Sequence, residues 1–150
     1  YVVREKLFNP NIVSFLQLPD DHEIAEIRAP KGVVGRTLDA VGFRNIPINS
    51  NSAAYTTVLA DAGKSIFHPS TDANARTFTI ASNASVAYPI GTVIQFVNMT
   101  SQVVTIAINS DTMYLGGTGT TGSRSLAIYG VANAMKMTST TWLISGSGLT

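Results

Sequence analysis

The sequence predicts an all-β protein, an antiparallel β-sandwich or jelly-roll-like domain with an N-terminal extended arm. Short runs after residue 50 alternate apolar and polar residues, which is the period of half-buried strands. Turn-forming residues separate these runs every ~10–15 positions, as in sandwiches and barrels. The nearest approach to a helix, "YGVANAMKM", contains Gly, Val and Asn, which disfavour helix, so we expect it to be extended.

The chain changes in composition near residue 50. Residues 1–50 hold 12 of the 19 charged residues, whereas the last hundred residues hold 28 Ser and Thr. We therefore expect an N-terminal arm or small docking segment at residues 1–48 and a β-sandwich domain at residues 49–150. Within the first part, the alternation in "HEIAEIRAP" indicates one strand, and "GRTLDAV" is compatible with a helical turn.

Five runs in the second part have apolar residues at alternate positions, so each run places them on one face of a strand. The predicted inward residues are Phe78 and Ile80 in "RTFTIA", Ile94 and Phe96 in "TVIQFVN", Val104, Ile106 and Ile108 in "QVVTIAI", Leu126 and Ile128 in "RSLAIYG", and Trp142 and Ile144 in "TTWLIS". Turn formers stand between the runs, at residues 61–63, 69–74, 89–91, 98–102, 109–111 and 139–140.

The segment Gly117-x-Gly119-x-x-Gly122 has the spacing of a dinucleotide-binding fingerprint. That site needs a helix after the glycines and an acidic residue about 20 positions further on. The residues after Gly122 indicate a strand, and no Asp or Glu follows Asp111. We therefore interpret the segment as a flexible hairpin loop and expect no cofactor.

Few residue types suited to catalysis or metal binding occur in the β region. Asp61, Asp72 and Asp111 each lie in a turn signal, where Asx-turn hydrogen bonding is the expected role. His68 precedes Pro69 at a strand end, which is typical of a structural turn residue, and His22 lies in an acidic run. Cysteine is absent, which excludes disulfides and thiolate metal sites. We expect no catalytic or metal-binding residues and no enzyme.

Charge and hydropathy limit the partners. A net charge of +1 gives no electrostatic basis for binding nucleic acid, and no apolar run reaches the ~18 residues of a membrane span. Charged residues make up 13% of the chain, against a usual ~25%, while hydrophobic residues reach 45%. Charged residues this scarce leave apolar surface uncovered. We therefore expect a subunit interface in a homo-oligomer, either a trimer or a dimer.

Most aromatic residues fall at strand positions, where core packing is the ordinary role. Tyr114 and Tyr129 flank the glycine-rich loop, and the alternative for them is exposure and stacking on a sugar. They are the candidate glycan contacts.

From about residue 41 onward the chain resembles a β-rich domain of tailed-bacteriophage virion proteins of the tail-fibre, head-fibre or decoration type. The resemblance rests on seven stretches that occur in order over about 110 residues. They are "NSNSAAYT", "LADAGKSIFHP", "ARTFTI", "AYPIGTVIQFVN", "VTIAI", "GTGTTGSRSLAIYG" and "WLISGSGLT".

The resemblance implies a non-enzymatic structural module on the virion surface, usually homo-oligomeric. We expect a capsid-decoration or fibre subunit that contacts itself and, through the N-terminal arm, other virion proteins. The alternative is a receptor-binding module of a tail fibre that recognises host cell-surface glycan. Residues 9–38 are similar instead to the start of the regulatory subdomain of bacterial potassium-transport proteins, over about 30 residues. No nucleotide or ion regulation is expected from so short a likeness.

Overall fold

The computed structural model describes residues 12–17, 23–27 and 45–150, the first two ranges as backbone only. The chain divides into two compact units, Tyr1–Asn45 and Ile46–Thr150. The regular structure of the described residues is all strand apart from one short 3-10 turn, η2 (Leu59–Asp61). The predicted all-β class is therefore confirmed.

The first unit contains an antiparallel pair, β1 (Ile12–Gln17) and β2 (Glu23–Ile27). The strand expected in "HEIAEIRAP" is confirmed as β2. The helical turn expected in "GRTLDAV" and the histidine at position 22 lie outside the described residues.

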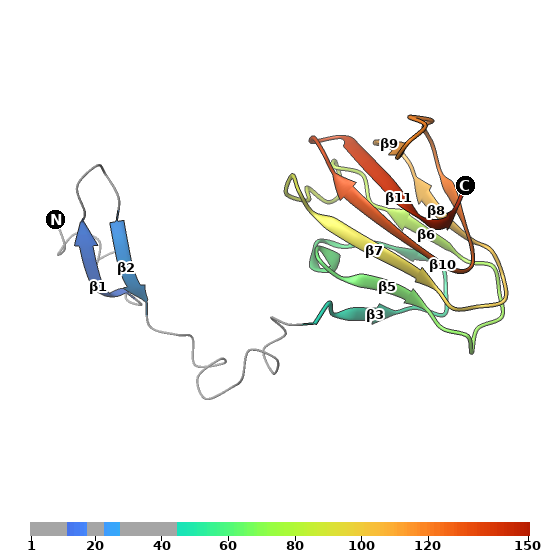
Figure 1. The fold of residues 1–150 in the computed structure, drawn as a ribbon, viewed down its shortest axis with the longest axis horizontal. Helices are drawn as coiled ribbons and strands as arrows, with labels where there is room; N and C mark the ends of the chain where they lie inside the picture. Colours follow the sequence, from blue (N-terminus) through green and yellow to red (C-terminus); the bar gives the residue numbers. More distant parts are fainter. Residues whose placement is uncertain (1–11, 18–22, 28–44) are drawn as a thin grey trace. The chain divides into compact units, whose positions relative to one another are not determined.

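Nine strands of the second unit form one curled sheet, in the order β3-β5-β7-β10-β8-β6-β4 (Figure 1). Strand β11 pairs with β10 on one side and β9 on the other. The bounds are β3 (Ile48–Ser50), β4 (Tyr55–Thr56), β5 (Ser65–His68), β6 (Thr77–Ile80), β7 (Val93–Asn98), β8 (Val104–Ile108), β9 (Thr112–Leu115), β10 (Arg124–Lys136) and β11 (Thr141–Leu149).

The long strand β10 joins the two halves of the sheet. Its last part, from Val131, pairs with β7, and its first three residues pair with β8. Between these parts the register against β11 shifts, so β10 carries a bulge. Asn98 supports the bulge, because its amide donates to the carbonyls of Leu126 and Ala127 at 3.2 and 3.0 Å. The bend at the bulge lets one sheet fold over into a two-layered, sandwich-like domain.

The strand pairing differs from the antiparallel arrangement expected from the sequence. Strand β10 is antiparallel to each of its neighbours, but five other pairs are parallel: β3–β5, β5–β7, β4–β6, β6–β8 and β9–β11. From β3 to β8 the chain alternates between the two halves of the sheet, so neighbours in one half are two strands apart in sequence. The alternation of apolar residues is the same in both pairing modes, so it does not predict their direction.

The core lies between the two halves and contains nearly all of the predicted inward residues. Its members are Ile66, Phe78, Ile80, Ala81, Tyr88, Ile94, Phe96, Val104, Ile106, Met113, Leu126, Ala132, Ala134, Trp142 and Ile144. The prediction that Ile128 shares the buried face of Leu126 is wrong, since Ile128 is 48% exposed. It lies on the bulge, where the left-handed backbone of Tyr129 (φ 56°) interrupts the alternation.

Candidate functional site

The three aspartates of the β domain accept hydrogen bonds that hold the structure together, but these are not the Asx-turn bonds expected from the sequence. Asp61 is buried and accepts hydrogen bonds from the Asn49 amide at 2.9 Å, the Tyr55 hydroxyl at 2.8 Å and the Val58 backbone N–H at 2.9 Å. Burial, and then the bond to Asp61, raise the pKa of Tyr55. Through these hydrogen bonds, Asp61 links β3 and β4 to η2, and both of its carboxylate oxygens are used as acceptors.

His68 and Asp72 form a second structural cluster. The His68 ring is fully buried, with Nδ1 2.9 Å from the Asn51 carbonyl oxygen and Nε2 3.0 Å from that of Asn74. Arg76 donates from Nε to Asp72 at 2.7 Å, and this bond lowers the pKa of the Asp72 carboxyl. Because both ring nitrogens face protein carbonyls, His68 presents no nitrogen to a substrate or metal. This agrees with its predicted structural role.

A third cluster surrounds Asp111. Both carboxylate oxygens accept from the Asn83 backbone N–H, at 3.1 and 3.2 Å, and Oδ2 accepts from Trp142 Nε1 at 3.3 Å. Lys136 Nζ donates to the Asn83 side-chain oxygen at 2.9 Å. Sequence reasoning missed this cluster, because Lys136 occupies an inward strand position and Asn83 lies in a turn 53 residues earlier. Among the described residues, no group of three or more His, Cys, Asp or Glu side chains is arranged to hold a metal ion.

The glycine-rich segment is a loop, as predicted. It joins β9 to β10, and Gly117, Gly119 and Gly122 all have positive φ angles of 85°, 70° and 111°. The Leu115 N–H donates to the Thr120 carbonyl at 2.8 Å, which closes a tight turn. Strand β10 begins two residues after Gly122, so no helix N-terminus is there to bind a pyrophosphate.

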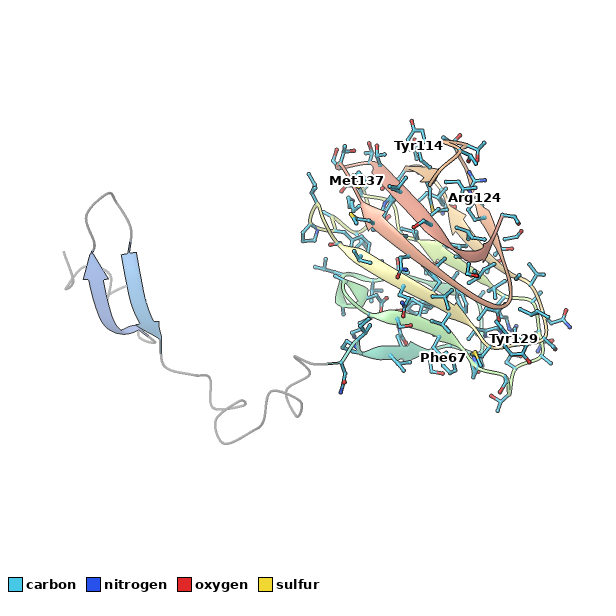
Figure 2. The ribbon with its side chains drawn as sticks, in the orientation of Figure 1. Phe67, Tyr114, Arg124, Tyr129 and Met137 are labelled. Atoms are coloured by element: carbon cyan, nitrogen blue, oxygen red, sulfur yellow. The ribbon has the colours of Figure 1, made fainter. Side chains whose placement is uncertain are left out.

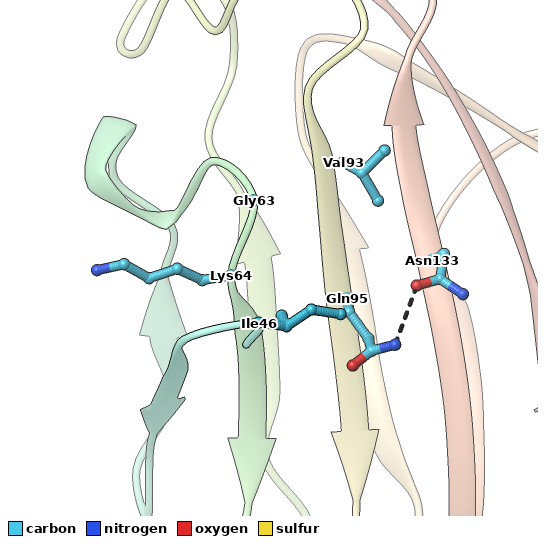
Figure 3. Close-up of a pocket in the computed structure, with 6 residues that line it drawn as sticks. All are labelled: Ile46, Gly63, Lys64, Val93, Gln95 and Asn133. Atoms are coloured by element: carbon cyan, nitrogen blue, oxygen red, sulfur yellow. Dashed lines mark hydrogen bonds between the residues drawn. The ribbon is translucent and has the colours of Figure 1, made fainter. Parts of the chain in front are cut away.

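A small pocket lies on the outer surface at the start of β5 and β7 (Figure 3). Its volume is ≈ 140 Å³, smaller than the ~300–1,000 Å³ of typical ligand sites. The lining residues are Ile46, Gly63, Lys64, Val93, Gln95 and Asn133. Among these residues, the Gln95 side-chain amide donates to the Asn133 side-chain oxygen at 3.3 Å (Figure 3). Without an acid or histidine in its wall, the pocket offers no catalytic pair.

Four apolar side chains form a row across the outer face of the sheet. Met135 of β10 is the cross-strand partner of Val93 in β7 and of Leu143 in β11, and Leu143 is in turn the partner of Tyr114 in β9. Met135, Leu143 and Tyr114 are 42%, 39% and 40% exposed. We call these four residues the apolar row.

Two further exposed residues lie near the end of the apolar row. Met137 follows β10 directly, and Figure 2 shows it at the same end of the domain as Tyr114. Ile90 is placed near the end of β10, because the N–H of the next residue, Gly91, donates to the Lys136 carbonyl at 2.8 Å. On the other side of the row, the same strands carry polar residues, namely Gln95, Asn133 and Ser145. The apolar area therefore has a polar edge on this side.

Tyr114 and Tyr129, the candidate glycan contacts, are both exposed, but the structure does not bring them together. Tyr114 belongs to the apolar row, whereas Tyr129 is on the β10 bulge at the other end of the domain (Figure 2). Tyr129 is 68% exposed. A single sugar platform built from both rings is not formed, and each ring alone stays a predicted contact.

Comparison with family models, with curated proteins and with solved structures gave no significant match to this chain. In the described part of the chain, no helix has the length and hydropathy needed to cross a membrane.

Proposed function

We propose that this chain is a bacteriophage virion structural protein, a capsid-decoration or fibre subunit that assembles as a homo-oligomer on the particle surface. The observation that carries the proposal is the apolar row. Exposed apolar patches rimmed by polar residues mark protein–protein contacts, because their burial against a partner removes apolar surface from water.

A second copy of the chain is the partner that fits the row best. The row is apolar, and charged residues are scarce throughout the domain, so recognition there depends on shape and not on an oppositely charged surface. A patch that runs straight across four strands can meet its own copy in a closed symmetric contact. A dimer or trimer satisfies this requirement.

Placement on a virion is supported by the sequence resemblance and by the way polar groups are used. The acids of the β domain are engaged in hydrogen bonds that hold turns and strands together, so they serve stability and not a reaction. Such a domain leaves few backbone groups open to proteases, which suits a particle exposed to its surroundings. In this proposal the N-terminal arm, residues 1–48, contacts other virion proteins.

Native mass spectrometry of the full chain at micromolar concentration tests the assembly. We expect a dimer or trimer for the wild type and a monomer for the double variant Met135→Ser/Leu143→Ser. The matched control is Ile128→Ser, which removes an equally exposed apolar residue at the bulge and should leave the oligomer intact. A wild-type monomer would refute assembly through the row. A density map of the phage particle that lacks this chain would refute the virion role.

A second candidate function is binding to host cell-surface glycan, favoured by the exposed Tyr129. A bulky residue with positive φ is unusual, and such strained positions cluster at functional sites. A glycan array probed with the wild type and with Tyr129→Ala and Tyr114→Ala tests this function. Saturable binding that is lost in one variant identifies the contact, and absence of binding to any glycan counts against it.

A further inference from the structure

Lys136 is the last residue of β10, and its side chain is buried to 1% exposure. Both ion pairs of the described residues involve Asp72, so the Lys136 amine has no carboxylate within ion-pair distance. Its hydrogen bond goes instead to the Asn83 side-chain oxygen at 2.9 Å. Burying an amine without a counter-ion is costly, so an ordinary core position would not select lysine.

Aromatic rings cover the Lys136 side of this contact, whereas Asn83 is only partly buried. Lys136 Nζ lies 5.3 Å from the centre of the Trp142 ring and 5.9 Å from that of Tyr88. Both carboxylate oxygens of Asp111 accept from the Asn83 backbone N–H, and Oδ2 also accepts from Trp142 Nε1. An amine, an amide carbonyl and a carboxylate thus lie near one another in a partly buried site beside two aromatic rings.

We propose that Lys136 and Asn83 are joined by an intramolecular isopeptide bond that forms in the folded protein. The juxtaposition places the amine beside the side-chain carbonyl it would attack, which is the proximity that makes an intramolecular reaction fast. The product is a secondary amide between Lys136 Nζ and Asn83 Cγ, with loss of one molecule of ammonia.

The reaction balances without an oxidant or a co-reactant. The Lys136 ammonium loses one proton, and the neutral amine attacks Asn83 Cγ. Because Asp111 is not within ion-pair distance of Nζ, the proton reaches the Asp111 carboxylate through a water molecule. The bond from Cγ to Nδ2 then breaks, and the leaving nitrogen takes the second amine proton and departs as ammonia. Asp111 gives its proton to that ammonia, which leaves as ammonium, and the carboxylate is restored. Asp111 accepts from the Asn83 backbone N–H and from Trp142 Nε1, and the Trp142 ring faces Lys136 Nζ, so this proton transfer is assigned to Asp111.

The bond would tie together the two halves of the sheet. Asn83 lies in the turn that follows β6, in the half formed by β4, β6 and β8, whereas Lys136 ends β10 beside β7 in the other half. The closed loop spans 53 residues. A cross-link of this kind restricts the unfolded chain, so it raises resistance to heat and to pulling.

Intact-mass spectrometry of the purified full chain, followed by peptide sequencing after digestion, tests the proposal. We expect a mass lower than that of the sequence by one ammonia, and a branched peptide that joins the Lys136 and Asn83 segments. The full sequence mass, with Lys136 recovered in a linear peptide, would overturn it. An asparagine that cyclises to a succinimide also loses ammonia, so the branched peptide is the deciding observation.

Two variants separate the isopeptide bond from other losses of ammonia. Lys136→Arg and Asp111→Asn should have full mass, and Lys136→Arg should unfold at a lower temperature. The matched control Lys64→Arg changes a lysine of the same domain and should keep the branched peptide. Loss of ammonia that persists in Lys136→Arg would refute the role of Lys136. If a variant fails to fold, the wild-type peptide map alone decides the proposal.

Discussion

The inner and outer faces of β10 and β11 both carry apolar residues, but only those of the inner face are buried. Inside, β10 contributes the small residues Ala132 and Ala134, which are fully buried. Outside, it contributes Met135, which is 42% exposed and opposite Leu143. Inside, β11 adds Trp142 and Ile144, which are also fully buried. Met135 and Leu143 therefore differ from the inner residues in exposure and not in size. Apolar alternation alone is therefore not a measure of burial within one subunit.

The two faces should respond differently to substitution, with the largest effect inside. Trp142→Ala removes the largest fully buried side chain, together with its hydrogen bond to Asp111 and its edge contact with Tyr88. We expect a loss of about 3–5 kcal/mol in the free energy of unfolding, from the lost burial and the cavity. Urea unfolding at equilibrium measures it, and a loss under about 1 kcal/mol would contradict the described core.

A substitution at Gly146, where the backbones of β10 and β11 approach closely, should have the next largest effect on stability. A Cβ added at Gly146 would lie 2.1 Å from the Val131 carbonyl oxygen and 2.6 Å from the Ala132 Cα, which are backbone atoms that cannot turn away. We expect Gly146→Ala to cost about 1–3 kcal/mol through overpacking, as seen in thermal unfolding. Ser145→Ala, at the neighbouring exposed position, is the control. A Gly146→Ala variant as stable as the control would argue against the β10–β11 pairing.

The Asp72 cluster predicts a smaller effect, which depends on pH. The Arg76 hydrogen bond lowers the pKa of Asp72 below its usual value of about 3.9 in the folded state. Its contribution is therefore present above that value and is lost as pH falls through the folded pKa. Asp72→Asn should reduce stability at neutral pH and flatten its decline in acid. Equilibrium unfolding from neutral to acidic pH measures this effect. An equal loss of unfolding free energy in acid for the wild type and for Asp72→Asn would contradict the role of Asp72.

The outer face should show the smallest effect on stability. Leu143→Ser alone is expected to change the free energy of unfolding of the monomer by less than about 0.5 kcal/mol, because its side chain is partly in solvent. Urea unfolding at a concentration low enough to keep the protein monomeric measures this quantity. A cost of several kcal/mol would mean that Leu143 packs within its own subunit, and the contrast between the two faces would fail.

Much of the fold follows from short-range patterns. The alternation in "RTFTIA" and "TVIQFVN" predicted the buried pairs Phe78 and Ile80, and Ile94 and Phe96, because a strand turns successive side chains to opposite faces. Parallel pairing was not predictable in the same way, since it depends on which half of the sheet each strand joins. Ile128 was misplaced because a bulge is a local interruption that leaves no mark on the alternation itself.

The candidate sites were less accessible to sequence reasoning. Exposure of Tyr114 and Tyr129 was only the alternative to core packing in the sequence interpretation, and their separation depends on how far β10 extends past the loop. The partnership of Lys136 and Asn83 joins positions 53 residues apart. A signal for it was present, since lysine at an inward strand position between alanines and methionines is unusual, but the sequence does not name its partner.

The central place of β10 has a consequence for synthesis of the protein. This strand bridges β7, β8 and β11, yet it follows β3 to β9 in the chain, so those strands emerge from the ribosome without the element that joins them. Contacts between residues so distant in sequence form slowly. A chain that terminates before residue 124 has no β10 to link its two half-sheets. We therefore expect such truncated products to be more open to proteases than the complete domain.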